Sequence, residues 1–396
     1  MALESGDFHF TSMGTTEDMT RYTVGGYHPI RIGDIIGSTR EDDTRSSGDT
    51  KIAQYRIMHK LGFGSFAMVW LAQMTTSPAF VEVKITTADD ASTNEAAMLK
   101  AVLKVRTIGE RHVPTLLDHF ILRGPNGEHL VLVTDVVAPI LEVPFSGPLW
   151  RKTVALGLVK AVAHLHANGI VHGDLHLGNV GVAIPKLIDE DPNEIMQDLG
   201  AYNARLYPSK QTSSLPPYVV SPCELPTFYK QLANSNLPQT KLFDFGGAHE
   251  VGKLPLDFQC AVVACAPETV FSLVVEKIDN PPMELPTDIW ALGTAIYEIV
   301  TGSSLFYGVD YSGIFSKMAE MLGTLPDGWK EWWKSRSKAP AVSPSGADAW
   351  WIQRREILRK NCADDADVDA LIALLRKILV LDPKARPTPE QILQDA

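Results

Sequence analysis

The sequence predicts a mixed α+β fold with two lobes, a small lobe rich in β-strands followed by a larger helical lobe. Apolar and polar residues alternate through much of residues 55–85, as they do in half-buried strands. From about residue 149 onward, apolar residues recur instead at the spacing of helices. A length of 396 residues also fits two lobes better than one domain.

The small lobe is expected over residues 51–137. Residues 55–74, YRIMHKLGFGSFAMVWLAQM, predict two strands joined by a tight turn at a Gly-rich centre, and FVEVKI, residues 80–85, predicts another strand. STNEAAMLKAVLKV, residues 92–105, predicts a helix with Ser92 as N-cap and Glu95 three residues on. HLVLVTDVV, residues 129–137, predicts a buried strand.

The larger lobe is expected over residues 138–396. Helices are predicted for residues 149–169, ending at Gly169 as C-cap, for residues 287–302, around the Trp-rich stretch 329–351, and for residues 367–383. Residues 181–240 are rich in proline and lack periodicity, so an inserted loop or linker is expected there. The acidic residues 1–50 predict a partly flexible N-terminal tail.

Composition narrows the class of protein. A net charge of -11 disfavours direct binding of nucleic acid, because phosphate backbones favour Lys and Arg. The four cysteines are too few and too scattered for a disulfide framework or a zinc site. Neither a secretory signal nor a membrane span is recognised. We therefore expect an intracellular protein of the cytoplasm or nucleus with no membrane partner.

Two features of the small lobe could bind a nucleotide. Gly62 and Gly64 would let the main chain approach phosphates, although Ala67 stands where a third glycine is common, and such a hairpin is otherwise just a turn. Lys84 lies on an apolar strand, where its ammonium needs either water or an anion. That anion could be a phosphate or the carboxylate of Glu95, unless Glu95 instead forms a capping box in its own helix.

Three oxygen-bearing side chains in the larger lobe suggest a magnesium site. HGDLHLGN, residues 172–179, carries Asp174 and, at the fifth position after it, Asn179. KLFDFGG, residues 241–247, places Asp244 after a short apolar strand. Carboxylate and amide oxygens suit Mg²⁺, which bridges phosphate oxygens, and Asp174 could orient a hydroxyl group. The alternative for Asp174 is a polar residue in a turn.

Further acidic residues follow in CAPETVF, residues 265–271, and TDIWALG, residues 287–293. Glu268 needs a cation if it is buried, and Arg386 is the candidate. Asp288 could anchor the main chain around Asp174. Acids at helix N-termini, near the positive end of the dipole, are the simpler explanation for each position.

Taken together, these motifs resemble the signature set of protein kinases. The resemblance covers about residues 22–396 and is strongest to the SR-protein kinases, which are serine/threonine kinases. GGYHPIRIGD, LGFGSFAMVWLA and the long spacer before Asp244 carry it. The resemblance implies a bilobal protein-kinase fold and transfer of the γ-phosphoryl group of ATP to Ser or Thr hydroxyls of proteins.

The resemblance also implies a role for each catalytic residue. Lys84 would hold the α- and β-phosphates of ATP, and Asp174 would be the catalytic base. His176 would stand beside the transferring phosphate, where many kinases carry a lysine. Asn179 and Asp244 would bind Mg²⁺.

The remaining roles concern the nucleotide and the scaffold. Glu95 would pair with the phosphate-binding lysine, and adenine would bind main chain at Asp135 to Val137, after a gatekeeper at Thr134. The other residues that would contact ATP are Leu61, Gly62, Phe63, Gly64, Ser65, Phe66 and Val69, while Glu268, Asp288 and Arg386 would be structural.

The sequence departs from the family pattern at three places. Gly173 replaces an Arg that normally pairs with a phosphorylated activation loop, and residues 244–268 contain no Ser, Thr or Tyr. Activation-loop phosphorylation is therefore not expected to control this protein. His176 lacks the fixed charge of lysine, and CAVVACAPE, residues 260–268, lacks the Thr that commonly bonds the catalytic Asp. Slow turnover or an unusual substrate would follow.

Two other functions stay open. HGDLHLGN also resembles the catalytic loop of aminoglycoside and choline phosphotransferases, which act on small molecules. A weakly active pseudokinase scaffold is the other alternative. As a protein kinase, the chain would act as a monomer on a basic or Arg-Ser-rich protein substrate of the splicing type.

Overall fold

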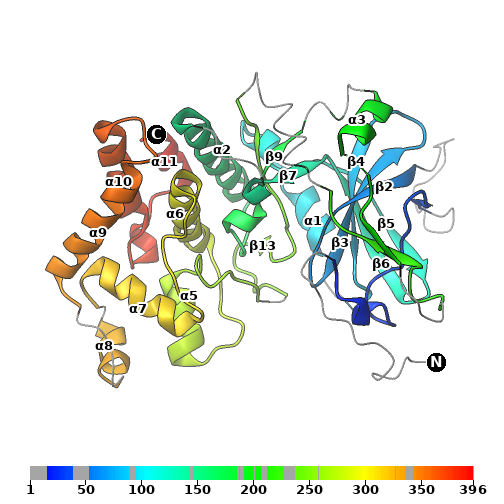
Figure 1. The fold of residues 1–396 in the computed structure, drawn as a ribbon. Coiled ribbons are helices and arrows are strands. Elements are labelled where there is room, and N and C mark those ends of the chain that lie inside the picture. The colour runs from blue at the N-terminus through cyan, green and yellow to red at the C-terminus, as the bar shows by residue number, and fades with distance from the viewer. Residues whose placement is uncertain are drawn as a thin grey trace. The chain divides into compact units, whose positions relative to one another are not determined.

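The chain forms two compact units (Figure 1). The first takes in Met1–Ala96, Pro114–Ala138 and Ala183–Ser235, and the second Ala97–Val113, Pro139–Val182 and Asn236–Ala396. A strand-rich unit and a helical unit are the two lobes that the sequence predicts. The computed structural model describes residues 16–38, 53–89, 94–142, 147–184, 187, 191–199, 201–206, 212–223, 225, 237–256, 258–325, 327–335 and 342–395.

An antiparallel six-stranded sheet, in the order β1-β2-β3-β4-β6-β5, forms the first unit. The strands predicted over residues 55–74, 80–85 and 129–137 are confirmed as β2, β3, β4 and β6. The prediction lacks β1, which has only three residues, and β5, which does not alternate regularly. The bounds are β1 Ile35–Gly37, β2 Gln54–Phe63, β3 Ala67–Met74, β4 Phe80–Thr86, β5 Leu116–Gly124 and β6 Gly127–Thr134, with α1 at Asn94–Ala101.

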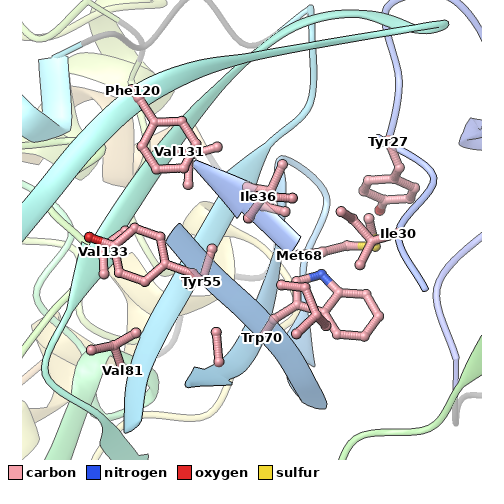
Figure 2. Packing of buried hydrophobic residues seen from close by; sticks show 14 of the residues in the cluster. Tyr27, Ile30, Ile36, Tyr55, Met68, Trp70, Val81, Phe120, Val131 and Val133 are labelled. Atoms are coloured by element: carbon pink, nitrogen blue, oxygen red, sulfur yellow. The ribbon is translucent and has the colours of Figure 1, made fainter. Parts of the chain in front are cut away.

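One face of this sheet carries the hydrophobic core of the first unit (Figure 2). Val81, Val83 and Ile85 of β4 belong to it, so Glu82 and Lys84, which alternate with them, face the other side. The buried cluster comprises Met19, Tyr22, Tyr27, Ile30, Ile36, Tyr55, Ile57, Met68, Trp70, Ala72, Val81, Val83, Ile85, Phe120, Val131, Val133 and Val219.

Residues 16–38 belong to this core, although the sequence predicts a tail there. Tyr22, Tyr27 and Ile30 are buried in the cluster, and Figure 2 shows Tyr27 and Ile30 near Met68. Burying a large apolar side chain contributes about 1.5–3 kcal/mol, enough for a few such residues to hold a segment in place. The predicted tail therefore needs correction over these residues, because its acidic composition concealed a few widely spaced apolar anchors.

The described part of the insert also packs within the first unit, whereas it was predicted to belong to the second lobe. The hydroxyl of Tyr218 accepts the main-chain N–H of Ile32 (3.1 Å), and the Asn126 amide donates to the carbonyl of Ser214 (2.9 Å). The insert also contains regular elements that the lack of periodicity did not predict, namely α3 Pro192–Leu199, β10 Ala204–Leu206 and β11 Tyr218–Val220.

Helices dominate the second unit. The helices predicted over residues 149–169, 287–302 and 367–383 are confirmed as α2, α6 and α10. No described helix combines the length and apolarity needed to cross a bilayer. The bounds are α2 Pro148–Ala167, β8 Ile170–Val171, β9 Val180–Ala183, β12 Thr240–Leu242, β13 His249–Glu250, α5 Pro267–Phe271, α6 Leu285–Thr301, α7 Tyr311–Leu322, α8 Asp327–Lys334, α9 Pro344–Leu358, α10 Asp365–Ile378 and α11 Pro389–Gln394.

Short elements connect these segments. β7, Val137–Pro139, follows β6, and a five-residue π-helical segment, Ser272–Glu276, follows α5. Single 3₁₀ turns lie at Met19–Arg21, Glu110–His112, Ile140–Glu142, Leu177–Asn179 and Pro383–Ala385.

A buried ion pair ties residues 16–38 to the sheet. The ammonium of Lys60 on β2 donates to the carboxylate of Glu17, and both side chains are almost fully buried. Glu17 also accepts the hydroxyl of Tyr22 (2.7 Å). Burial lowers the pKa of Lys60, although Glu17 acts to raise it. The two charges therefore stabilise each other only while both are present.

Replacing Glu17 by Gln is expected to destabilise the first unit by about 3–5 kcal/mol, because Lys60 would stay buried without its counter-charge. The thermal denaturation midpoint of the full chain measures this effect. The double variant Glu17→Leu/Lys60→Met, which removes both charges, is expected to recover most of the loss. An unchanged midpoint in Glu17→Gln would contradict the prediction.

Candidate active site

Gly62 and Gly64 lie at the turn between β2 and β3, where the N–H of Gly64 donates to the carbonyl of Ala67 (2.8 Å). The hydroxyl of Tyr27 donates to the carbonyl of Gly64 (2.8 Å). A Cβ atom at Gly62 or Gly64 would meet no atom within 4 Å, and neither glycine has a positive φ. The fold of the first unit therefore does not itself require glycine here. Around this turn, Phe63, Ser65 and Phe66 are exposed, Val69 is half-buried and Leu61 is buried.

Lys84 lies opposite Val69 in the pairing of β4 with β3. Its ammonium donates a 2.7 Å hydrogen bond to Oε2 of Glu95, whose side chain is only 8% exposed. The ion pair considered for Glu95 is thus formed. Ser92, the other member of the predicted capping box, lies outside the described residues.

The segment after β6 contains Asp135 and Val137, the residues expected to contact adenine. The Asp135 carboxylate accepts the main-chain N–H of Thr115, and the N–H of Val137 hydrogen bonds to the carboxyl of Glu82. Burial raises the pKa of Glu82 to about 8, although the Val137 N–H and Lys84 act to lower it. Sequence reasoning missed Glu82. The signal was the alternation in FVEVKI, which places this acid on the same face as Lys84.

Asp174 lies in the second unit, between β8 and β9. Its Oδ1 accepts the N–H of Ala261 (3.1 Å), and its Oδ2 lies 3.6 Å from Nε2 of His176. Because the N–H of Gly178 donates to Nδ1 of His176 (3.0 Å), the proton of the neutral ring is on Nε2 and faces Asp174. Burial tends to raise the pKa of Asp174, but the nearby His176 and His172 and the Ala261 N–H hold it below its ordinary value.

The main-chain N–H of Ala261 therefore supplies a bond to Asp174 in place of the Thr that is absent from this sequence. The preceding carbonyl, of Cys260, accepts the hydroxyl of Tyr311 on α7 (2.9 Å). This second bond fixes the segment that presents the Ala261 N–H.

Asn179 and Asp244 come together through the pairing of β9 with β12. Val180 pairs with Leu242, and the N–H of Phe243 donates to the carbonyl of Asn179 (2.9 Å). The Asn179 amide nitrogen donates to the carbonyl of Asp174 (2.9 Å), which leaves its side-chain oxygen as the atom able to bind a cation. Asp244 has a φ of 64°, a left-handed conformation rare for residues other than glycine.

Asp288 holds the main chain immediately before Asp174. It accepts the N–H groups of His172 (2.8 Å) and Gly173 (3.0 Å), and its Oδ2 lies 3.1 Å from Nε2 of His166. Burial tends to raise the pKa of Asp288, but these hydrogen bonds and the two histidines hold it below its ordinary value. The carboxylate therefore stays ionised inside the unit and positions the loop.

Glu268 and Arg386 form a two-bond ion pair, with distances of 2.8 and 2.6 Å between the guanidinium nitrogens and the carboxylate oxygens. The Arg386 side chain is fully buried and also donates to the carbonyl of Pro286 (2.7 Å). The pair thus links α5 to the segment between α10 and α11.

Comparison with known proteins finds similarity to protein kinases. Residues 232–396 match the family model of the protein kinase domain. Serine/threonine-protein kinase spk-1 of Caenorhabditis elegans is 31% identical over 185 residues, which cover 43% of this chain and 17% of the relative. Protein kinase dsk1 of Schizosaccharomyces pombe is 30% identical over 213 residues, which cover 50% of this chain and 35% of that relative. The chain thus spans well under half of the length of these two relatives.

Two further matches cover more of the chain. Serine/threonine-protein kinase SRPK of Physarum polycephalum is 26% identical over 99% of this chain and 92% of its own length. A solved kinase-domain structure superposes with a TM-score of 0.55 at 19% identity, over 86% of this chain and 94% of that one. The fold is that of the protein kinases. The sequence is similar to serine/threonine-protein kinases, among them one named SRPK.

Gly173 has a structural reason to replace Arg. Its φ is +79°, and a Cβ there would lie 2.8 Å from the carbonyl oxygen of Gly247. Gly173→Ala is therefore expected to destabilise the second unit by more than the roughly 1–2 kcal/mol that a left-handed backbone costs a non-glycine residue. Denaturation midpoints of the full chain measure the loss.

Gly252→Ala is the matched control, because Gly252 has a φ of +78° but no atom within 4 Å of a built Cβ. It isolates the cost of the backbone conformation from the cost of the clash. Equal losses in the two variants would mean that the contact with Gly247 does not constrain position 173.

Proposed function

We propose that the protein is an ATP-dependent protein serine/threonine kinase of the SRPK type. The observation that carries the proposal is the group formed by Asp174, Asn179 and Asp244 within the second unit. The Asn179 amide is hydrogen-bonded to the main chain of Asp174, and Asn179 and Asp244 flank the paired strands β9 and β12. The names of the relatives support serine and threonine hydroxyls as acceptors.

Each residue has a defined task in this proposal. Asp174 remains ionised at neutral pH, because its pKa lies below the ordinary value, and it orients the attacking hydroxyl. His176 presents its Nε2 proton beside Asp174, where lysine would provide a fixed charge. Lys84, positioned by Glu95, would hold phosphate groups of ATP.

The donors in the second unit fit Mg²⁺ carried by the nucleotide. The described residues contain no group of three or more His, Cys, Asp or Glu able to hold a metal by themselves. Mg²⁺ commonly takes only one or two protein ligands and completes its shell with phosphate oxygens and water. Asn179 and Asp244 would supply those ligands, and the ion would neutralise charge on the phosphates.

The proposed substrate is a basic, Arg-Ser-rich protein. The net charge of -11 favours a positively charged partner over nucleic acid. The relatives include SRSF protein kinase 3 of Homo sapiens, which is 26% identical over 41% of this chain. The proposal extends to a monomeric enzyme acting in the cytoplasm or nucleus.

Asp174→Asn is expected to lower the rate of phosphate transfer from ATP to an Arg-Ser-rich peptide by about 10²–10⁴-fold, since an amide cannot accept the proton. Labelling of peptide serine in the presence of Mg²⁺ measures the rate. Asp348→Asn, an exposed aspartate on α9, is the matched control and should leave the rate unchanged. Labelling of aminoglycoside or choline but never of peptide would instead identify a small-molecule kinase, and nucleotide binding without transfer a pseudokinase.

Phosphatase treatment of the purified protein is expected to leave its activity unchanged. Residues 244–268 contain no hydroxyl group, and Gly173 removes the arginine that would read a phosphate. Activity before and after treatment, with intact mass confirming removal of phosphate, gives the comparison. A marked loss of activity would show that a phosphorylated residue controls the enzyme.

A further inference from the structure

Glu82 is a half-buried ionisable group of the first unit's candidate site that has no role in the proposed reaction. It shares a face of β4 with Lys84, while Val81 and Val83 face the core. In the sheet it pairs with Thr134, the last residue of β6. This register places Glu82 at the start of the segment that continues to Val137.

The carboxyl of Glu82 hydrogen bonds to the main-chain N–H of Val137. That N–H belongs to the stretch that the proposed function assigns to adenine. A single N–H donor cannot serve a carboxyl group and a base nitrogen at full strength, because each needs the same approach to the hydrogen. Glu82 and the adenine base therefore compete for one atom.

The surrounding charges make this competition sensitive to protonation. Glu95 on α1 and Asp135 disfavour a negative charge on Glu82, and Lys84 favours it. The ammonium of Lys84 is already bonded to Glu95. Burial adds to the two acidic neighbours, so the pKa of about 8 leaves the carboxyl mostly neutral at pH 7.

We propose that Glu82 is a gating residue for the nucleotide, occupying the Val137 N–H until the adenine base displaces it. The inference rests on the proposed function and adds a regulatory residue to the same site. A neutral carboxyl accepts a weaker hydrogen bond than a carboxylate does. The gate therefore opens more easily below pH 8 than above it.

The test compares wild type, Glu82→Ala and the isosteric Glu82→Gln by calorimetric binding of adenosine and of Mg-ATP at pH 7 and pH 9. We expect both substances to bind wild type more weakly at pH 9. Glu82→Ala should bind both more tightly than wild type, by about tenfold or more at pH 9, which corresponds to one lost charge-assisted hydrogen bond. Glu82→Gln should bind equally at both pH values.

Adenosine separates competition for the base from repulsion of phosphate. A gain confined to Mg-ATP would mean that Glu82 acts on the phosphates through its charge, and it would overturn the gate. Glu128→Ala, an exposed glutamate on β6, is the control for general effects and should behave like wild type.

The remaining outcomes distinguish failure of the gate from failure of the proposed function. Equal binding by wild type and both Glu82 variants, or weaker binding by the variants, would overturn the gate and leave an ATP-dependent kinase intact. Binding of neither probe to any variant would overturn both. Binding to Glu82→Ala alone would support the gate in its strongest form.

A second readout needs no nucleotide. A raised pKa means that the folded protein holds a proton that the unfolded chain releases between pH 4.5 and about 8. The thermal midpoint of wild type should therefore fall across this window relative to Glu82→Gln. Parallel midpoints would contradict the protonation that the gate requires.

Discussion

The arrangement of the second unit depends on one buried carboxylate. Asp288 accepts two consecutive main-chain N–H groups, those of His172 and Gly173, and these immediately precede Asp174. An ionised group inside a protein is tolerated only when hydrogen bonds satisfy it, and here it receives them from the loop that it must hold. The Asn179 amide then donates to the carbonyl of Asp174, so the constraint passes from α6 to one of the two proposed magnesium ligands.

The sequence lacks a threonine and a lysine that protein kinases commonly carry near the catalytic aspartate, and other groups of the chain stand in their places. The main-chain N–H of Ala261 replaces the absent threonine as a hydrogen-bond donor to Asp174. Only a substitution of Ala261 by proline would remove this donor. The absent lysine is replaced by His176, whose ring orientation is set by the N–H of Gly178. Charge is lost at the second position, but a hydrogen-bond donor remains. The local chemistry thus stays that of an anchored carboxylate with a donor beside it.

Sequence reasoning reached the two lobes, most strands of the sheet and the main helices, because alternating and helical periodicities directly reflect which faces are buried. It also singled out Lys84, Asp174 and Asp244 as candidate site residues, because a charged residue on an apolar strand or beside a glycine turn needs a partner. It missed contacts whose partners are main-chain atoms. Neither the Ala261 bond nor the Glu82 bond leaves a trace in residue identity, because every residue but proline has an N–H.

Short and irregular segments were harder to predict for a related reason. Residues 16–38 and the insert are held by a few anchors far apart in sequence, such as Tyr22 and Val219 in the same buried cluster. No local window contains both partners of such a contact. The proline-rich composition of the insert reflects the exposed positions between its anchors.

The path of the chain has a consequence for how the protein is made. Because the insert joins β9 to β12 of the second unit yet contributes Val219 to the core of the first, the small unit is discontinuous in sequence. During synthesis, the core of the first unit cannot be completed until Val219 has left the ribosome. More than half of the polypeptide has been made by then. Contacts of such long sequence separation fold slowly and leave apolar strands uncovered meanwhile. Neither unit can be cut out as one uninterrupted fragment.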